Sequence, residues 1–115
     1  LLKEVLLYFS ERLATARNLK INDIIVDPGF GFAKTVKQNY ELLQNLDLMQ
    51  TLEAPILAGL SRKSMIYKPL NLDAEQALNG TTALNMMALT KGAKILRVHD
   101  VTEAIECVQL YNQLP

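Results

Sequence analysis

Residues 55–64 read Pro-Ile-Leu-Ala-Gly-Leu-Ser-Arg-Lys-Ser, a short apolar run followed at once by a polar, basic loop. Apolarity without polar alternation is typical of a strand buried on both faces, as in parallel sheets. The same order recurs on either side, as Asp-Ile-Ile-Val-Asp-Pro-Gly at 23–29 and as Lys-Ile-Leu-Arg-Val-His-Asp at 94–100. The sequence therefore predicts three buried parallel strands, each ending in polar residues. The expected strands are residues 23–27, 55–60 and 94–99.

The segments around these strands carry apolar residues at helical spacing, which predicts helices over 2–18 and 35–52. Asp73 begins an Asp-Ala-Glu-Gln capping box, which predicts a helix from there to residue 91. Thr102 is expected to cap the last helix. The resulting order, α-β-α-β-α-β-α, is typical of an α/β fold with a parallel sheet and right-handed crossovers.

The composition narrows the class of protein. The chain has 115 residues, 50% of them hydrophobic, and its 12 Lys+Arg balance its 12 Asp+Glu. This is the composition of one packed domain, and the zero net charge provides no overall field for nucleic acid or an anionic membrane. No apolar run approaches the roughly 20 residues that span a bilayer. One cysteine and one histidine exclude a disulfide framework and a multi-histidine metal cage.

Three strands are too few to close a barrel by themselves. A (β/α)8 barrel needs about eight strands and about 250 residues, whereas an open three-stranded sheet leaves two apolar edges unpaired. We therefore expect either a small open sheet or the back part of a barrel. The helical pattern already present at Leu1 favours a piece of something longer.

The polar residues at the strand ends are the candidate site, because ligands of parallel α/β proteins bind there. Arg97 and His99 alternate with Leu96 and Val98, so they share the face that points away from the helices. A guanidinium and an imidazole about 7 Å apart suit an anion with several oxygens, such as phosphate or diphosphate. An arginine paired with a carboxylate and a histidine satisfied by the backbone are equally open alternatives.

Asp27 and the loop after it are a second candidate. A carboxylate can hold the amidine-like edge of a heterocycle by two parallel hydrogen bonds or pair with a cation, although Asp before Pro-Gly also commonly just forms a turn. Gly31 lets the backbone approach a ligand, and of Phe30 and Phe32 we expect one in the core and one facing the site. Lys63 can donate to substrate oxygens or ring nitrogens, although such a basic loop can also be merely solvated.

Three stretches together resemble one family, the dihydropteroate synthases. They are Asp27-Pro-Gly-Phe-Gly-Phe-Ala-Lys-Thr35, Ala58-Gly-Leu-Ser-Arg-Lys-Ser-Met-Ile66 and Ile95-Leu-Arg-Val-His-Asp-Val101. The resemblance covers essentially the whole chain. It implies the C-terminal portion of a (β/α)8 TIM barrel, with three parallel strands and flanking helices. Residues 1–115 would form the C-terminal part of a pterin-binding domain whose earlier strands lie outside this chain. Ala33 departs from the family, which often has Gly there.

The resemblance also implies an activity, a transferase reaction of folate biosynthesis. The family condenses 6-hydroxymethyl-7,8-dihydropterin diphosphate with 4-aminobenzoate by an SN1-like route, giving 7,8-dihydropteroate and diphosphate. By resemblance, Lys63, Arg97 and His99 are the expected catalytic residues, and no metal ligand is expected in this chain. The expected substrate-binding residues are Asp27, Gly31, Phe32, Gly59, Arg62, Lys63, Ser64, Arg97, Val98 and His99.

Further expectations follow from the same resemblance. Mg²⁺ assists the departure of diphosphate and is held by residues outside this chain. The protein is cytoplasmic and forms a homodimer through its late helices, over 73–91 and 102–114, without a nucleic-acid or membrane partner. Because other site residues of the family lie on the missing strands, the 115-residue chain alone is expected to be inactive. Two alternatives stay open: the pterin-binding domain of a folate or corrinoid methyltransferase, and a non-catalytic half-barrel that assembles with a partner.

Overall fold

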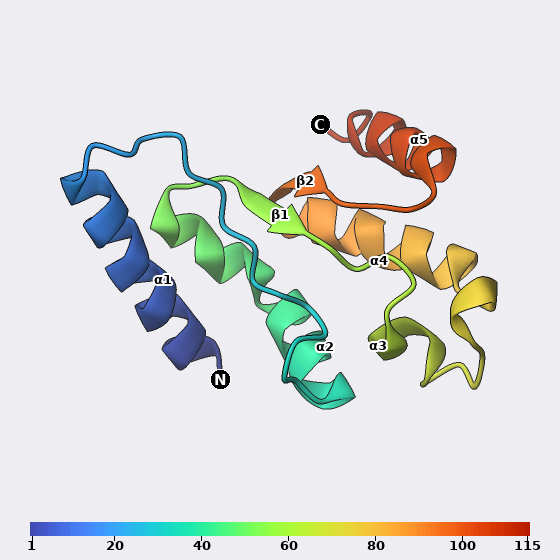
Figure 1. The fold of residues 1–115 in the computed structure, drawn as a ribbon. Coiled ribbons are helices and arrows are strands. Elements are labelled where there is room, and N and C mark those ends of the chain that lie inside the picture. Colours follow the sequence, from blue (N-terminus) through green and yellow to red (C-terminus); the bar gives the residue numbers. More distant parts are fainter.

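The structure is a computed structural model that describes residues 1–115, and it alternates helices and strands (Figure 1). Its extents are 44 × 32 × 23 Å, with α1 at one end of the molecule and α5 toward the other. The elements are α1 (Leu2–Asn18), α2 (Val36–Gln44), the 3-10 helix η1 (Leu46–Leu52), β1 (Ile56–Ala58), α3 (Ser64–Tyr67), the 3-10 helix η2 (Ala74–Gln76), α4 (Leu78–Thr90), β2 (Ala93–Leu96) and α5 (Val101–Tyr111).

β1 and β2 form a parallel two-stranded sheet in which Leu57 lies opposite Ile95. The connection between them runs through α3, η2 and α4, and α4 packs against both β2 and α5. Both strands are shorter than expected, so Arg97 and His99 follow the end of β2 instead of lying within it. The N–H of Arg97 still donates to the carbonyl oxygen of Ala58 at 3.1 Å, which extends the ladder by one bond.

The third expected strand, the one nearest the N-terminus, is wrong except at one residue. Val26 forms a single parallel bridge to β1, donating to the Pro55 oxygen at 2.9 Å and accepting from Leu57 N–H at 2.8 Å. In a parallel ladder the next donors on either side would be the nitrogens of Pro28 and Pro55, and proline has no N–H. The pairing therefore stops at Val26, and the neighbouring Ile25 is 54% exposed.

The helices differ from the expectation in three places. The helix predicted over 35–52 divides into α2 and η1. The capping box at Asp73 is confirmed, but it closes only the three residues of η2 before α4 begins. The prediction that Thr102 caps the last helix is wrong, because α5 begins one residue earlier. Asp100 precedes it and makes no cap bond, since its carboxylate binds Arg62 instead.

The core lies between the strands and α2, η1 and α3. Its largest fully buried apolar side chains are Phe30, Leu42, Leu43, Leu46, Met49, Ile56, Leu60, Met65 and Ile66. Phe30 is completely buried whereas Phe32 is 68% exposed, which confirms that one of the two aromatics belongs to the core. None of the helices combines the length and apolarity that crossing a membrane requires.

Candidate functional site

The polar residues that follow the strands gather around one small cavity. Its volume is about 120 Å³, and it is lined by Gly59, Ser61, Lys63, Arg97, Val98 and His99. The sequence reasoning missed Ser61 as a site residue. The signal was available, because Ser61 stands in the same polar loop as Lys63 and directly after a buried strand.

Asp27 uses both of its carboxylate oxygens within the chain. Oδ1 accepts from the Gly29 N–H at 2.9 Å, and Oδ2 accepts from Arg97 Nη1 at 2.9 Å. The turn and the cation partner, which were alternatives for Asp27, therefore occur together. The side chains of Arg97 and Asp27 are 53% and 34% exposed, so this ion pair contributes about 0–1 kcal/mol. A pairing this weak can give way to a bound ligand.

Lys63 reaches back over the loop that carries the two aromatics. Its Nζ donates to the Phe30 carbonyl oxygen and lies 5.2 Å from the centre of the Phe32 ring, within cation–π range. Its stem passes over Gly31, where φ is +89° and where a Cβ would lie 3.3 Å from Lys63 Cδ. Burial and, next, the charge of Arg97 lower the pKa of Lys63 below its ordinary value. A glycine at residue 31 thus allows the positive φ of the turn and leaves space for the Lys63 side chain.

His99 is held by Ser61, which belongs to the other loop. Ser61 Oγ lies 2.7 Å from His99 Nδ1 and also accepts the His99 backbone N–H at 3.2 Å. These two contacts orient the ring and leave Nε2 as the atom that can meet a ligand. Gly59 gives the guanidinium of Arg97 the space that it occupies, because a Cβ at residue 59 would lie 2.4 Å from Arg97 Nη2.

Arg62 is engaged elsewhere, which argues against its expected contact with substrate. Its Nε and Nη2 bind Oδ2 and Oδ1 of Asp100, each at 3.0 Å, and its Nη1 donates to the carbonyl oxygens of Ala74 and Glu75 at 2.8 Å. Four of about five N–H donors of the guanidinium thus have partners within the chain. The hydrogen bond between the Arg62 and Asp100 side chains raises the pKa of Arg62 and lowers the pKa of Asp100. Arg62 does not line the cavity.

Two other predicted site residues, Phe32 and Ser64, do not line the cavity. Phe32 stands beside Lys63 with most of its ring exposed. Ser64 is the first residue of α3 and is half-buried. Phe32 is thus next to a lining residue in space, whereas Ser64 is next to one, Lys63, only in the sequence.

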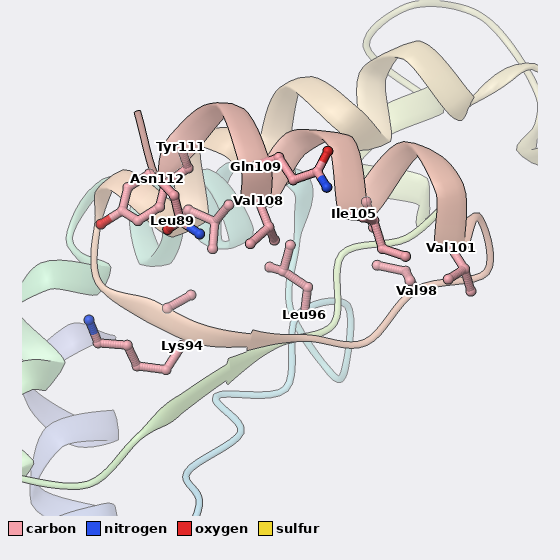
Figure 2. A pocket seen from close by; sticks show the side chains of 12 residues that line it. Leu89, Lys94, Leu96, Val98, Val101, Ile105, Val108, Gln109, Tyr111 and Asn112 are labelled. Atoms are coloured by element: carbon pink, nitrogen blue, oxygen red, sulfur yellow. The ribbon is translucent and has the colours of Figure 1, made fainter. Parts of the chain in front are cut away.

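A second, apolar hollow lies on the other side of β2. A groove of about 490 Å³ runs between β2 and α5, and Figure 2 shows Leu96 and Val98 facing Ile105 and Val108 across it. The prediction that Leu96 and Val98 face the helices is thereby confirmed. The only charged side chain of the groove is Lys94. The smaller cavity, which holds the cationic and polar groups, is the better candidate for a reactive site.

A parallel α/β chain with a carboxylate, a lysine and an arginine–histidine pair at its strand ends suits a planar, amidine-bearing, anionic ligand. The family described as "Pterin binding enzyme" matches residues 1–99. Since this is most of the sequence, the chain belongs to the family of pterin-binding enzymes.

Within that family the chain is similar to dihydropteroate synthases. It is 41% identical over 112 residues to that of Haemophilus influenzae and 40% identical over 109 residues to that of Escherichia coli. These alignments cover 96% and 93% of this chain but 41% and 39% of the relatives. The chain thus spans about two fifths of the length of the curated relatives it matches.

Solved structures agree. The Yersinia pestis dihydropteroate synthase superposes with a TM-score of 0.93 at 34% identity, over 97% of this chain and 54% of that one. The Xanthomonas albilineans enzyme, solved in complex with 7,8-dihydropteroate, gives 0.93 at 34% identity, over 98% of this chain and 46% of that one. These superpositions confirm the expected fold class, a parallel α/β portion of a TIM barrel.

Proposed function

We propose that the protein to which this chain belongs is a dihydropteroate synthase. It would condense 6-hydroxymethyl-7,8-dihydropterin diphosphate with 4-aminobenzoate, giving 7,8-dihydropteroate and diphosphate. One observation carries the proposal: Lys63, Arg97 and His99 meet at one cavity, with Asp27 bonded to Arg97, in a chain about 40% identical to named synthases.

In this proposal, Arg97 and His99 bind the leaving diphosphate. The bond from the exocyclic carbon to the diphosphate oxygen breaks, and its electron pair stays with the diphosphate. A guanidinium and an imidazole fixed in advance stabilise this developing charge without reorganising. The amine of 4-aminobenzoate then attacks the carbon and loses a proton. The role of these two residues is therefore electrostatic.

The pterin ring and the aminobenzoate ring are bound by residues that neighbour this pair. Asp27 accepts hydrogen bonds from the guanidine-like edge of the pterin, which requires Arg97 to leave Oδ2 and turn to the diphosphate. Lys63 reaches the pterin and the aminobenzoate, Phe32 packs against the aminobenzoate ring, and Ser64 meets its far end. The exposed Phe32 ring beside Lys63 supports this placement.

Magnesium is part of the same proposal, although the residues of this chain do not fit a magnesium site. No three His, Cys, Asp or Glu side chains lie together in a way that would hold a metal ion. We therefore propose that any magnesium ligand lies outside residues 1–115. Loss of activity on chelation, with recovery on adding Mg²⁺, is the check.

The decisive test is an assay of the full-length protein with both substrates. We expect release of diphosphate, and competition of free pyrophosphate with the pterin diphosphate. Arg97→Gln is expected to weaken pyrophosphate binding about 10- to 100-fold, the loss of one or two charge-assisted hydrogen bonds. Pterin binding without diphosphate release and without pyrophosphate competition would instead indicate the methyltransferase alternative, whose reaction has no diphosphate to hold.

The proposal includes a cytoplasmic homodimer that pairs through the late helices. Apolar side chains on or beside α4 and α5 are exposed, namely Met87, Val101, Ile105, Leu110 and Leu114. Sedimentation at several concentrations tests this. A stable monomer would contradict it, and so would a dimer whose association is unaffected by Ile105→Lys.

A further inference from the structure

Arg62 joins three segments of the chain beside the cavity. It lies in the loop after β1, its ion pair reaches Asp100 at the start of α5, and its Nη1 reaches the carbonyl oxygens of η2. Its own N–H donates to Thr81 Oγ1 of α4 at 3.0 Å. We name Arg62 and Asp100 together the clamp.

Each member of the clamp is a direct sequence neighbour of side chains that line the cavity. Arg62 separates Ser61 from Lys63, and Asp100 follows His99 directly. Ser61, Lys63 and His99 line the cavity, whereas neither member of the clamp does. We therefore expect a displacement of the clamp to disturb Lys63 and the bond between Ser61 and His99.

Two features indicate that the clamp serves the loops more than the stability of the fold. Arg62 has φ +55°, a left-handed conformation that is uncommon for a residue other than glycine. Asp100 occupies the N-cap position of α5, where a free aspartate would bond the first helical N–H groups. It gives up that role to bind Arg62. The two side chains are only 23% and 22% exposed, so the pair is ordered yet still near solvent.

We propose that Arg62 and Asp100 are positioning residues that hold Lys63 over the Phe30–Phe32 loop and His99 against Ser61. This rests on the proposed function. Neither residue touches the substrate. The clamp acts by placing the lysine and the histidine where the leaving diphosphate develops its charge, and small misplacements of such groups cost about 100-fold in rate.

The test uses the full-length protein with Arg62→Gln, Asp100→Asn and the double variant. We expect each single variant to lower kcat by about 10- to 100-fold, with KM for the pterin diphosphate within about threefold of the wild type. The double variant should fall no further than the worse single one, because both remove the same interaction. Arg17→Gln is the matched control, since Arg17 also donates to two carbonyl oxygens, those of Leu52 and Glu53, outside the site. It should keep kcat.

Four results would overturn the proposal. An unchanged kcat in both single variants is one, and losses that multiply in the double variant are another. A raised KM in Arg62→Gln alone would make Arg62 a direct ligand. An equal loss of kcat in Arg17→Gln would show that the effect comes from a general loss of stability.

A second readout does not depend on the reaction. The ring signal of His99 in NMR spectra, assigned by its loss in His99→Gln, should shift in Asp100→Asn and stay in place in Arg17→Gln. If the wild type releases no diphosphate, the proposed function is wrong. The His99 signal then remains as the test of whether the clamp positions His99. An unmoved His99 signal in Asp100→Asn overturns it.

Discussion

Gly59 is the residue around which the site is most tightly built. A Cβ there would lie 2.4 Å from Nη2 and 2.9 Å from Cζ of Arg97. Because this end of Arg97 is flexible and half-exposed, we expect Gly59→Ala to displace the guanidinium from its place in the cavity lining while the fold persists. Calorimetry should show about tenfold weaker pyrophosphate binding, the loss of one charge-assisted hydrogen bond, with Tm lowered by less than about 3 °C.

The control for this prediction is the same change in an Arg97→Ala background. There the new methyl group has no guanidinium to displace, so Gly59→Ala should add no further loss of binding. An additional loss would show that the substitution disturbs the backbone of β1 instead.

Lys63 makes stability depend on pH. Its pKa in the folded state is lowered below the ordinary 10.5, chiefly by burial and then by Arg97. Between the lowered pKa and 10.5 the unfolded chain binds more protons than the folded one, so stability should rise with pH across that window. The gain in the free energy of unfolding should vanish in Lys63→Gln. An equal pH dependence in both proteins would contradict the lowered pKa.

At the scale of elements, α3 and α4 pack closely at a glycine. A Cβ at Gly80 would lie 2.5 Å from Cγ2 of the buried Ile66. Alanine within a helix is normally favoured over glycine by about 1 kcal/mol, but overpacking a core costs about 1–3 kcal/mol. We therefore expect Gly80→Ala to destabilise the protein by about 1–2 kcal/mol in urea unfolding. Asn79→Ala, at an exposed position of α4, is the control and should be neutral or stabilising.

At the scale of the whole molecule, the cavity is smaller than a substrate needs. Small-molecule sites usually measure about 300–1,000 Å³, whereas this cavity measures about 120 Å³. We therefore expect residues 1–115 to contribute only part of the substrate site. We expect the 115-residue chain, produced alone with Mg²⁺ and both substrates, to release no diphosphate above background. The full-length protein is the positive control, and release at comparable rates by the short chain would refute this.

Much of the fold was predictable from sequence because its signals are local. The apolar runs at 55–60 and 94–99 mark both strands of the sheet, and helical spacing marks α1, α4 and α5. The third strand failed because its pairing depends on which N–H groups face β1, and prolines occupy both neighbouring positions. That fact is visible in the sequence only once the register is known.

The candidate site divides in the same way. The sequence by itself determined which residues stand at the ends of the strands, Asp27, Lys63, Arg97 and His99 among them, because a buried run followed by polar residues is a local pattern. Only the tertiary structure decided their partners. It pairs Arg97 with Asp27 and turns Arg62 toward Asp100, away from the cavity. The physical reason is that contacts between residues far apart in sequence depend on strand register and on loop conformation, such as the left-handed Arg62, and these take shape only when the segments pack together.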